Sequence, residues 1–386
     1  MKAKSIKGSS PEEIKAALQQ AKGEDFVPTL AIVFISIKQD RKAVCEILKN
    51  EGIDIFGATS CGEFIEGYQG EGSTVALLLD APHNSYKILF QDLNHQSVKV
   101  ASRHIADAAL LEYNNPSLLL LSTGTNSKGD VFDGESLAKS MYKYLGYDNV
   151  FFGGMAGDDM TFTGSAIFTH EKETDFGIAA IVFDADKIDM KGMAITGWKP
   201  MGISRTITKS SGNKIFTIDN SSAVEMYFKY LGKEEKKADH DFNLFEELGF
   251  TYPFITEREP GGDTVLRTPI KVDHIENALV LDVEMTEGTK FWFSMPPDFD
   301  IVDEILEEAH EVKRFNGLEA DALLIFSCAG RPPVLGPLVT AENDGLAEVW
   351  KTPMAGFFTY GEFGRSKNGK QEFHSGACCW VTLTEK

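Results

Sequence analysis

At 386 residues, the chain is long enough for two domains. Its 38 basic and 58 acidic residues give a formal net charge of −20, which repels a phosphate backbone and argues against nucleic acid as a partner. The 42% of hydrophobic and 25% of charged residues are typical of an ordinary soluble globular protein.

The sequence carries no strong targeting or redox signal. The longest apolar stretch, residues 30–37 with Ser36 inside it, is too short for a membrane span, and the polar residues 1–10 do not resemble a signal peptide. The five cysteines lack Cys-x-x-Cys or zinc-binding spacing. We therefore expect a cytoplasmic protein with reduced thiols and without membrane insertion, metal or cofactor.

The N-terminal region begins with a predicted helix. Ser10 suits the helix cap, and Pro11 followed by two glutamates suits the first turn. After this helix, an apolar strand closes on Ser36, a helix-compatible stretch covers residues 39–50, and a glycine-rich turn follows at 57–64. This order of strand, helix, strand and turn is typical of a βαβ crossover.

The same order appears again in the middle of the chain. Before it, residues 73–80 and 85–90 are predicted as antiparallel strands around a turn at 81–84, and a helix is predicted at 98–113. The second crossover comprises a strand closing on Ser122, a hydroxyl-rich loop at 123–130, a helix at 134–146 and a turn at 153–158. The loop lacks the Gly-x4-Gly-Lys-Ser/Thr pattern, so we do not predict nucleotide binding there.

A strand-rich region follows the second crossover. It contains predicted strands at 165–168, 177–183 and 187–196, a hairpin turn at 210–214 and a helix at 221–231. The run at 232–240 is the most polar of the chain and predicts a boundary between domains at 1–231 and 232–386.

The C-terminal part contains the third crossover. Strands are predicted at 264–268, 278–283 and 290–293, and a helix is predicted at 299–315. The crossover then comprises a strand closing on Ser327, a helix at 338–350 and a glycine-rich turn at 356–363. Residues 372–383 are predicted as one strand that closes a sheet.

Two of the three turns share a motif. Residues 57–64 and 356–363 both read Gly-x4-Gly-Glu-Phe, and residues 153–158 are a one-residue-shorter relative. Both strands of a βαβ unit run the same way, so its serine and its turn lie at one carboxyl edge, where open α/β sheets bind ligands. Glycines at such an edge permit positive φ and let backbone N–H groups approach a ligand. The alternative is that the glycines only form tight turns that the acidic residues cap.

These patterns predict the fold class. We expect an α/β protein of two halves, with repeated βαβ crossovers plus antiparallel strands and with pseudo-symmetry between the halves. Because the glycine-rich turn occurs in both halves, we expect residues 57–63 and 356–362 to lie close together and to share a site.

Arg331 is the leading candidate for a ligand contact. A guanidinium at the end of a strand can bind a carboxylate through two parallel hydrogen bonds. The alternative is an ion pair with Glu362 or Glu63 that locks the turns. Those two glutamates occupy equivalent motif positions and either bind an ammonium group together or cap their own turns, with capping favoured. Tyr360 suits the apolar wall of a pocket, or ordinary core packing.

Other residue types suggest weaker alternatives. Asp158 and Asp159 are oxygen ligands suited to a hard cation, but no further ligand spacing accompanies them. Cys328, His374 and Glu362 are the residue types of a Cys-His-acid nucleophile system. A cysteine at the end of a strand is more often a small buried hydrophobic residue.

Taken together, several of these segments resemble the FIST family. The resemblance to its C-terminal half comes from residues 326–331, 356–362 and 373–374, and the resemblance to its N-terminal half comes from residues 57–63, 153–158, 198–202, 211–215 and 223–227. The sequence departs from the family pattern at Cys61, Ser222 and Ser375-Gly376. The resemblance implies FIST N-terminal-like and C-terminal-like domains that form a sensory, ligand-binding module of signal transduction without general catalytic activity.

On this basis we expect a non-catalytic cytoplasmic sensor that binds a small polar metabolite, such as an amino acid or another carboxylate, between the two halves. Signalling proteins are the expected partners. The alternatives are a cysteine-dependent hydrolase or transferase using Cys328 or Cys61, and a ligand-free protein-interaction adaptor. The predicted ligand contacts are Arg331, Glu362, Glu63, Thr59, Ser60, Cys61, Asp158, Gly154, Ser327, Cys328, Tyr360 and His374.

Overall fold

The computed structural model describes residues 1–233, 243–257, 264–317, 319–367 and 369–386. It confirms a mixed α/β fold with two compact units. Unit 1 comprises Met1–Ile195, Val302–Ala329 and Pro337–Lys386, and unit 2 comprises Thr196–Ile301 and Gly330–Gly336. These units are not the two sequence halves at 1–231 and 232–386, because the chain enters and leaves unit 2 twice. Residues 234–240 of the predicted polar boundary lie outside the described residues.

Three strand–helix–strand crossovers form the frame of unit 1, at the places that the sequence predicted. Their strands pair in parallel, and they are β2 (Leu30–Ile35), α2 (Arg41–Asn50) and β3 (Asp54–Thr59); β8 (Pro116–Ser122), α4 (Gly134–Leu145) and β9 (Phe151–Met155); and β22 (Ala322–Cys328), α8 (Leu338–Trp350) and β23 (Met354–Thr359). The first strand of each crossover is a continuous apolar run because both of its faces are buried.

Three sheets surround one hydrophobic core in unit 1. The remaining strands of this unit are β1 (Ala3–Gly8), β4 (Glu63–Ile65), β5 (Tyr68–Gly70), β6 (Thr74–Leu79), β7 (Tyr86–Asp92), β10 (Ile167–Phe168), β11 (Glu173–Thr174), β12 (Gly177–Asp184), β13 (Ile188–Ile195), β24 (Glu362–Arg365), β25 (Gln371–His374) and β26 (Cys378–Glu385). The strand orders are β1-β6-β2-β3-β10-β11, β25-β24-β9-β8-β12-β7 and β13-β26-β22-β23-β4-β5. Phe34 and Phe357, from two of these sheets, stack in the core with ring centroids 4.3 Å apart.

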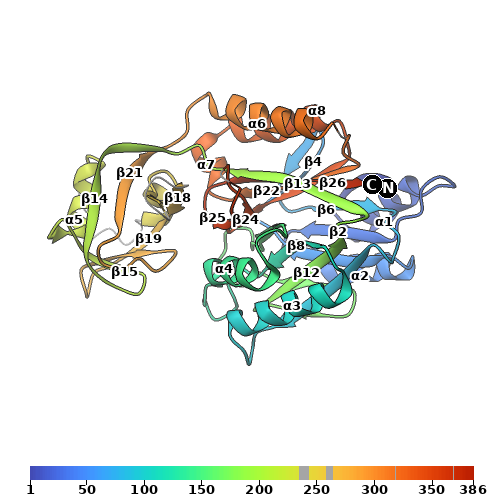
Figure 1. Ribbon diagram of the computed structural model, residues 1–386, viewed down its shortest axis with the longest axis horizontal. Helices are drawn as coiled ribbons and strands as arrows, with labels where there is room; N and C mark the ends of the chain where they lie inside the picture. Colours follow the sequence, from blue (N-terminus) through green and yellow to red (C-terminus); the bar gives the residue numbers. More distant parts are fainter. Residues whose placement is uncertain (234–242, 258–263, 318, 368) are drawn as a thin grey trace. The chain divides into compact units, whose positions relative to one another are not determined.

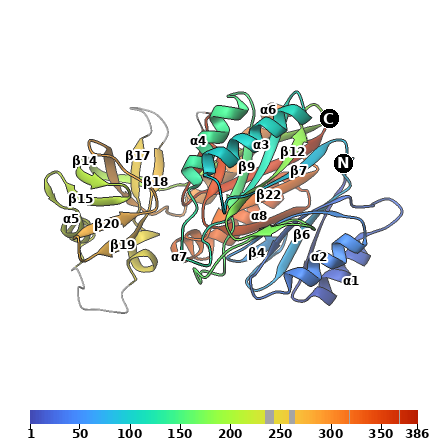
Figure 2. The same cartoon turned by 90° about the horizontal axis from the view of Figure 1, so that it is seen from below.

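A pair of helices covers the outer face of each sheet. These pairs are α1 (Pro11–Ala21) with α2, α3 (Val98–Glu112) with α4, and α6 (Ile301–Asn316) with α8 (Figure 1). Figure 2 shows α3 and α4 on one side of the strands of unit 1 and α1 and α2 on the other. The predicted cap of α1 is confirmed, because the Ser10 hydroxyl accepts the Glu13 N–H at 3.3 Å. Among the described residues, no helix is long and apolar enough to cross a membrane.

Unit 2 is built on antiparallel pairing. Its sheet contains β14 (Lys199–Ser211), β15 (Lys214–Ile218), β16 (Ser221–Ser222), β17 (Phe254–Glu257), β18 (Thr264–Arg267), β19 (Pro269–Asp273), β20 (Ala278–Leu281) and β21 (Lys290–Met295), and its helices are α5 (Ala223–Tyr230), the π-helix η1 (Phe245–Gly249) and α7 (Arg331–Leu335). The hairpin predicted at 210–214 is confirmed, and Gly212 supplies its positive φ of 58°. The core of unit 2 is rich in aromatic rings, with Phe254 stacked on Phe291 at 4.3 Å.

Two predictions about strands are wrong, one in how two strands pair and one in the number of strands. Residues 73–80 and 85–90 form β6 and β7 but no hairpin, because β6 pairs with β1 and β2 whereas β7 pairs with β12 in another sheet. The chain changes sheet at this turn so that β6 and Tyr86 enter the same core from different sides. Residues 372–383 are likewise two strands, β25 and β26, in different sheets, and Gly376 turns the chain between them with a φ of 75°.

Candidate functional site

The three glycine-rich turns of unit 1 meet at the carboxyl ends of the crossovers. Each turn leads into a short strand that leaves its own sheet and pairs with the second strand of another crossover. Thus β4 pairs with β23, β24 pairs with β9, and β10 pairs with β3. This exchange of short strands is cyclic, so each crossover pairs with both of the other crossovers.

Backbone hydrogen bonds also join the turns directly. They run from Cys61 N–H to Phe358 O (3.0 Å), Phe358 N–H to Gly62 O (2.9 Å), Gly157 N–H to Thr59 O (2.9 Å), Met155 N–H to Gly361 O (2.8 Å) and Tyr360 N–H to Met155 O (3.1 Å). Residues 57–63 and 356–362 therefore lie side by side, as the sequence predicted. The internal repeat in the sequence and the shared ligand site stay predictions.

A buried glutamate closes each of the two matched turns. Glu63 accepts hydrogen bonds from the Ser60 hydroxyl, from the Ser73 N–H at 3.0 Å and from the Ser73 hydroxyl at 2.8 Å. Glu362 accepts them from the Thr359 hydroxyl at 2.5 Å and from the Ala377 N–H at 3.0 Å. Both carboxylates are fully buried. These contacts are those of capping residues, each of which ties its turn to a neighbouring segment.

Glu63 has an unusual protonation equilibrium. Burial raises the pKa of Glu63 to about 7, and the hydrogen bonds from Ser60 and Ser73 offset only part of that rise. The nearby Asp159 carboxylate raises the pKa further. Glu63 consequently changes charge close to neutral pH, which an exposed glutamate does not.

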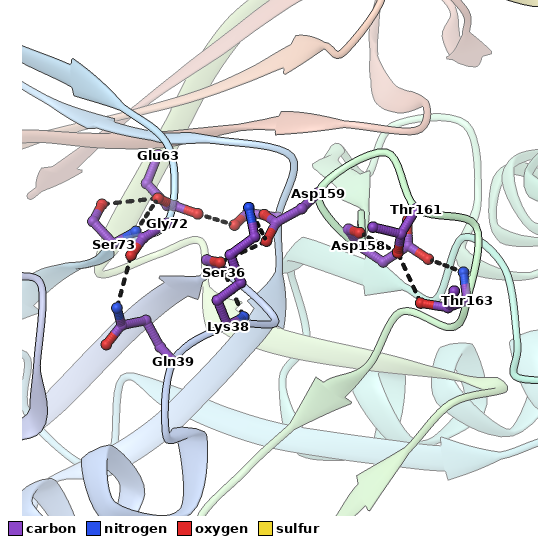
Figure 3. Close-up of polar contacts among 11 residues, drawn as sticks. Ser36, Lys38, Gln39, Glu63, Gly72, Ser73, Asp158, Asp159, Thr161 and Thr163 are labelled. Atoms are coloured by element: carbon purple, nitrogen blue, oxygen red, sulfur yellow. Dashed lines mark hydrogen bonds and ion pairs between the residues drawn. The ribbon is translucent and has the colours of Figure 1, made fainter.

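Asp158 closes the loop that follows the second turn. Its carboxylate accepts the N–H groups of Phe162 (3.1 Å), Thr163 (2.7 Å) and Gly164 (2.9 Å), together with the Tyr360 hydroxyl. Figure 3 shows Asp158 directed at this loop. The carboxylate is thus engaged by the protein itself, and the described residues contain no group of three His, Cys, Asp or Glu side chains placed to hold a metal ion.

Cys61 and Tyr360, which match in the motif, meet beside Asp158. The Tyr360 hydroxyl lies within hydrogen-bonding reach of the Cys61 sulfur, and the Tyr360 ring stacks on Phe162 with centroids 5.3 Å apart. Burial raises the pKa of Cys61 to about 12, so Cys61 is a neutral thiol at physiological pH. This protonation state argues against Cys61 as a nucleophile, whereas the nucleophile role of Cys328 stays a prediction.

A polar group that no motif predicted as a unit lies beside Glu63, although Asp159 was a candidate cation ligand by residue type. Asp159 accepts the Ser36 hydroxyl at 2.7 Å and lies 3.6 Å from the Lys38 ammonium (Figure 3). The Asp159 side chain is 6% exposed and that of Lys38 is 64% exposed. The other carboxylate oxygen of Asp159, Oδ1, is buried without a hydrogen-bond partner among the described residues. Ser36, which closes the first predicted strand, was a sequence signal that pointed to this place, whereas no motif includes Lys38.

The backbone beside this polar group is strained. Asp159, Met160 and Phe162 all have positive φ values, of 54°, 60° and 52°. Non-glycine residues adopt this conformation at a cost in free energy, and such residues often lie at functional sites. The hydrogen bonds to Asp158 hold the loop in this shape.

Arg331 lies in unit 2, at the start of α7. It is fully buried, donates a hydrogen bond to the Thr196 carbonyl at 2.9 Å, and places its guanidinium 5.8 Å from the centre of the Trp198 ring. Trp198 packs in a small apolar cluster with Ile255 and Leu266. The predicted binding of a ligand carboxylate by Arg331 stays a prediction.

The remaining predicted contacts lie in unit 1, on or next to the turns. The Thr59 hydroxyl donates to the Gly157 carbonyl at 2.6 Å. Gly154 and His374 are register partners of Glu362 on its two sides, and Ser327 and Cys328 end β22 opposite Phe358 and Thr359. All twelve predicted contacts except Arg331 therefore belong to unit 1, and their role in ligand binding stays a prediction.

Comparison with known protein families identifies the family to which these motifs point. The FIST N domain matches residues 29–221, and the FIST C domain matches residues 223–365. The chain belongs to the FIST family. FIST domains are sensory modules of signal transduction. In this FIST protein the first two turns lie in the N domain and the third lies in the C domain. A comparison with curated proteins finds no match.

Proposed function

We propose that this FIST protein is a non-catalytic cytoplasmic sensor that binds a small polar metabolite at the glycine-rich turns of unit 1 and transmits the signal to a protein partner. The observation that carries the proposal is the meeting of three turns, contributed by both sequence halves, at the carboxyl ends of parallel strands. Ligands of α/β proteins bind at such edges.

The polar groups beside the turns suit an amino acid or another carboxylate. The buried Oδ1 of Asp159 provides an acceptor for an ammonium group, and the largely exposed Lys38 provides a cation for a carboxylate. Phe162, which is 39% exposed and stacked on Tyr360, provides an apolar wall. Glu63, Glu362 and Asp158 hold the turns in place, and Arg331 is a further candidate for the carboxylate.

A thermal-shift screen tests this function. Wild-type protein is heated with single amino acids, dicarboxylates and nucleotides. A ligand at about a hundred times its Kd adds roughly 2.7 kcal/mol to the free energy of unfolding, which is a clear rise in Tm. We expect the rise to be lost in Asp159→Asn and Lys38→Gln, and to persist in Asp148→Asn, which changes an exposed aspartate between α4 and the amino end of β9.

The variant Arg331→Ala determines whether Arg331 belongs to the site. Loss of the ligand response in a folded Arg331→Ala protein would assign it the carboxylate contact. Absence of any response in folded wild-type protein across the panel would contradict the sensor function and favour a ligand-free adaptor.

A further inference from the structure

A closed ring of hydrogen bonds joins Glu63 to Asp159 in unit 1 (Figure 3). On one side of the ring, the Ser60 hydroxyl donates to Glu63, and the Ser60 carbonyl accepts the Asp159 N–H at 2.8 Å. On the other side, Ser73 donates to Glu63 through its N–H and its hydroxyl, while its carbonyl accepts the Ser36 N–H at 2.9 Å. The Ser36 hydroxyl then donates to Asp159 at 2.7 Å. Three serines thus hold the two carboxyl groups in fixed places near each other.

The two acids share one counter-ion, and that counter-ion is exposed. Glu63 is fully buried, and the Asp159 side chain is 6% exposed. Among the described residues, Lys38 is the only cation within ion-pair distance of either group, with its ammonium 3.6 Å from Asp159 Oδ2. The Lys38 side chain is 64% exposed, so water screens its charge and the side chain is free to turn away. Within the described part of the chain, the two acids therefore have no buried cation to balance them.

The strands packed on β4, all of which the structure describes in full, place no other cation beside Glu63. β5, β6 and β23 contain no charged residue. β1 carries Lys4, whose ammonium donates to the last carbonyl of α1 at 2.6 Å, and Lys7, whose ammonium lies 4.1 Å from the centre of the Tyr68 ring. The exposed Glu71 lies in the turn between β5 and β6. The charge of Glu63 is therefore set mainly by its burial, by the serines and by Asp159.

Asp159 and the proton of Glu63 are coupled electrostatically. Burial and the Asp159 carboxylate raise the pKa of Glu63 to about 7, although the serine hydrogen bonds lower it. A cation bound to Asp159 would offset the Asp159 charge and so lower the pKa of Glu63. Asp159 has an acceptor for such a group, because its Oδ1 is buried without a hydrogen-bond partner among the described residues. Cation binding and ionisation of Glu63 therefore favour each other.

Resting on the sensor function proposed above, we propose that the site is proton-linked: the ligand's protonated amine binds Asp159 Oδ1, and Glu63 releases its proton to the solvent. Lys38 turns from Asp159 to the ligand's carboxylate when the ligand has one. The affinity for the amine then rises with pH as Glu63 ionises, up to about pH 7. Above that pH the affinity is constant, because Glu63 is already ionised in the free protein. The sensor responds to its ligand and to pH together.

NMR titration of the Glu63 carboxyl carbon tests the coupling in the ligand-free protein. The full chain is made with isotope-labelled glutamate, and the Glu63 signal is assigned by its absence from Glu63→Gln. We expect Asp159→Asn to move the titration midpoint of Glu63 to lower pH, because a neutral side chain replaces a carboxylate. Asp148→Asn, at an exposed aspartate, should leave the midpoint unchanged. A Glu63 midpoint that is the same in folded Asp159→Asn as in wild type would overturn the proposal.

A small amine tests the link to binding. The probe is ethylamine, which stays protonated across the neutral range as a lysine side chain does. Tetramethylammonium chloride at the same concentration is the control, because it screens charge equally but donates no hydrogen bond. We expect saturating ethylamine to lower the Glu63 midpoint of wild type by about one pH unit, which corresponds to an amine affinity about tenfold higher when Glu63 is ionised. Tetramethylammonium should shift the midpoint much less, and Asp159→Asn should abolish the ethylamine shift.

The outcomes separate the proton linkage from the sensor function itself. An ethylamine shift that requires Asp159 supports the linkage. The proposal is overturned if ethylamine leaves the Glu63 midpoint of wild type unchanged, or shifts it equally in Asp159→Asn. If a compound of the thermal-shift panel still raises the Tm of wild type in that case, the sensor function stands without proton linkage. If no compound does, both proposals fail.

Discussion

The turns at 57–64 and 356–363 carry one motif in two different surroundings. In each, a hydroxyl three residues before the glutamate donates to its carboxylate, from Ser60 to Glu63 and from Thr359 to Glu362. The second partner differs, because Glu63 is bound by both the N–H and the hydroxyl of Ser73, whereas Glu362 is bound by the N–H of Ala377. The motif therefore determines the cap inside each turn, and the neighbouring segment determines how the cap is completed.

The first glycines of the two turns differ in a similar way. A Cβ at Gly57 would lie 2.3 Å from the ring of Phe168, which is the tip of a side chain. A Cβ at Gly356 would lie 2.2 Å from the ring of Phe64 and 2.4 Å from the Ile325 carbonyl oxygen. Equivalent motif positions thus face a side chain alone in one turn, and both a side chain and the backbone in the other.

Asp158→Ala tests whether the acid of the second turn anchors its loop, as the glutamates anchor theirs. The change leaves three N–H groups and the Tyr360 hydroxyl without their acceptor, so we expect the free energy of unfolding to fall by about 4 kcal/mol. Urea denaturation measures the loss. Asp148→Ala, at an exposed aspartate, should change stability by less than about 0.5 kcal/mol. Equal stability of the two variants would contradict the anchoring role.

Glu63→Gln tests the raised pKa of Glu63. Because its pKa is about 7 in the folded protein and 4.5 in the unfolded reference, Glu63 binds its proton more tightly when folded. Its stabilising contribution is complete below pH 4.5 and is lost as the pH rises through about 7, by about 3 kcal/mol in total.

Urea denaturation of wild type and Glu63→Gln between these pH values measures the effect. We expect the wild type to lose stability relative to Glu63→Gln as the pH rises. The control Glu46→Gln, at an exposed glutamate, should follow the wild-type curve. Parallel curves for wild type and Glu63→Gln would show that Glu63 titrates normally.

Gly356→Ala and Gly57→Ala compare the two turns directly. We expect Gly356→Ala to lower the free energy of unfolding by about 3 kcal/mol and Gly57→Ala by about half of that, because the Phe168 ring can move and a backbone carbonyl cannot. Phe168→Leu should partly restore the stability of Gly57→Ala, which a double-mutant cycle measures. A larger loss in Gly57→Ala than in Gly356→Ala would refute this reading of the two turns.

Tyr360→Phe removes the hydroxyl through which the third turn donates a hydrogen bond to Asp158 of the second turn. We expect a loss of about 1 kcal/mol, since Asp158 keeps its three N–H donors and the phenyl ring keeps its stacking on Phe162. Thermal denaturation measures it, with Tyr147→Phe, at a tyrosine that is 73% exposed, as the control. A loss as large as that of Asp158→Ala would mean that Tyr360 itself anchors the loop.

Much of unit 1 was predictable from local patterns. The capping serine of α1, the apolar strands and the helices of the three crossovers all follow from short-range signals, and the direction of a βαβ unit placed its turns at one edge. The pairing of β6 and β7 was not predictable in this way, because a strand's partner is set by residues far along the chain. The contact of Asp159 with Ser36, which are 123 residues apart, escaped prediction for the same reason.

The sequence by itself determined the three crossovers, the matched turns and the membership of the FIST family, because these depend on residue type, spacing and chain direction. Only the tertiary structure decided that the turns exchange strands in a cycle, that Arg331 belongs to unit 2 and that Glu63 titrates near neutral pH. Strand partners and desolvation are properties of the surroundings that distant segments create, and no single stretch of sequence contains them.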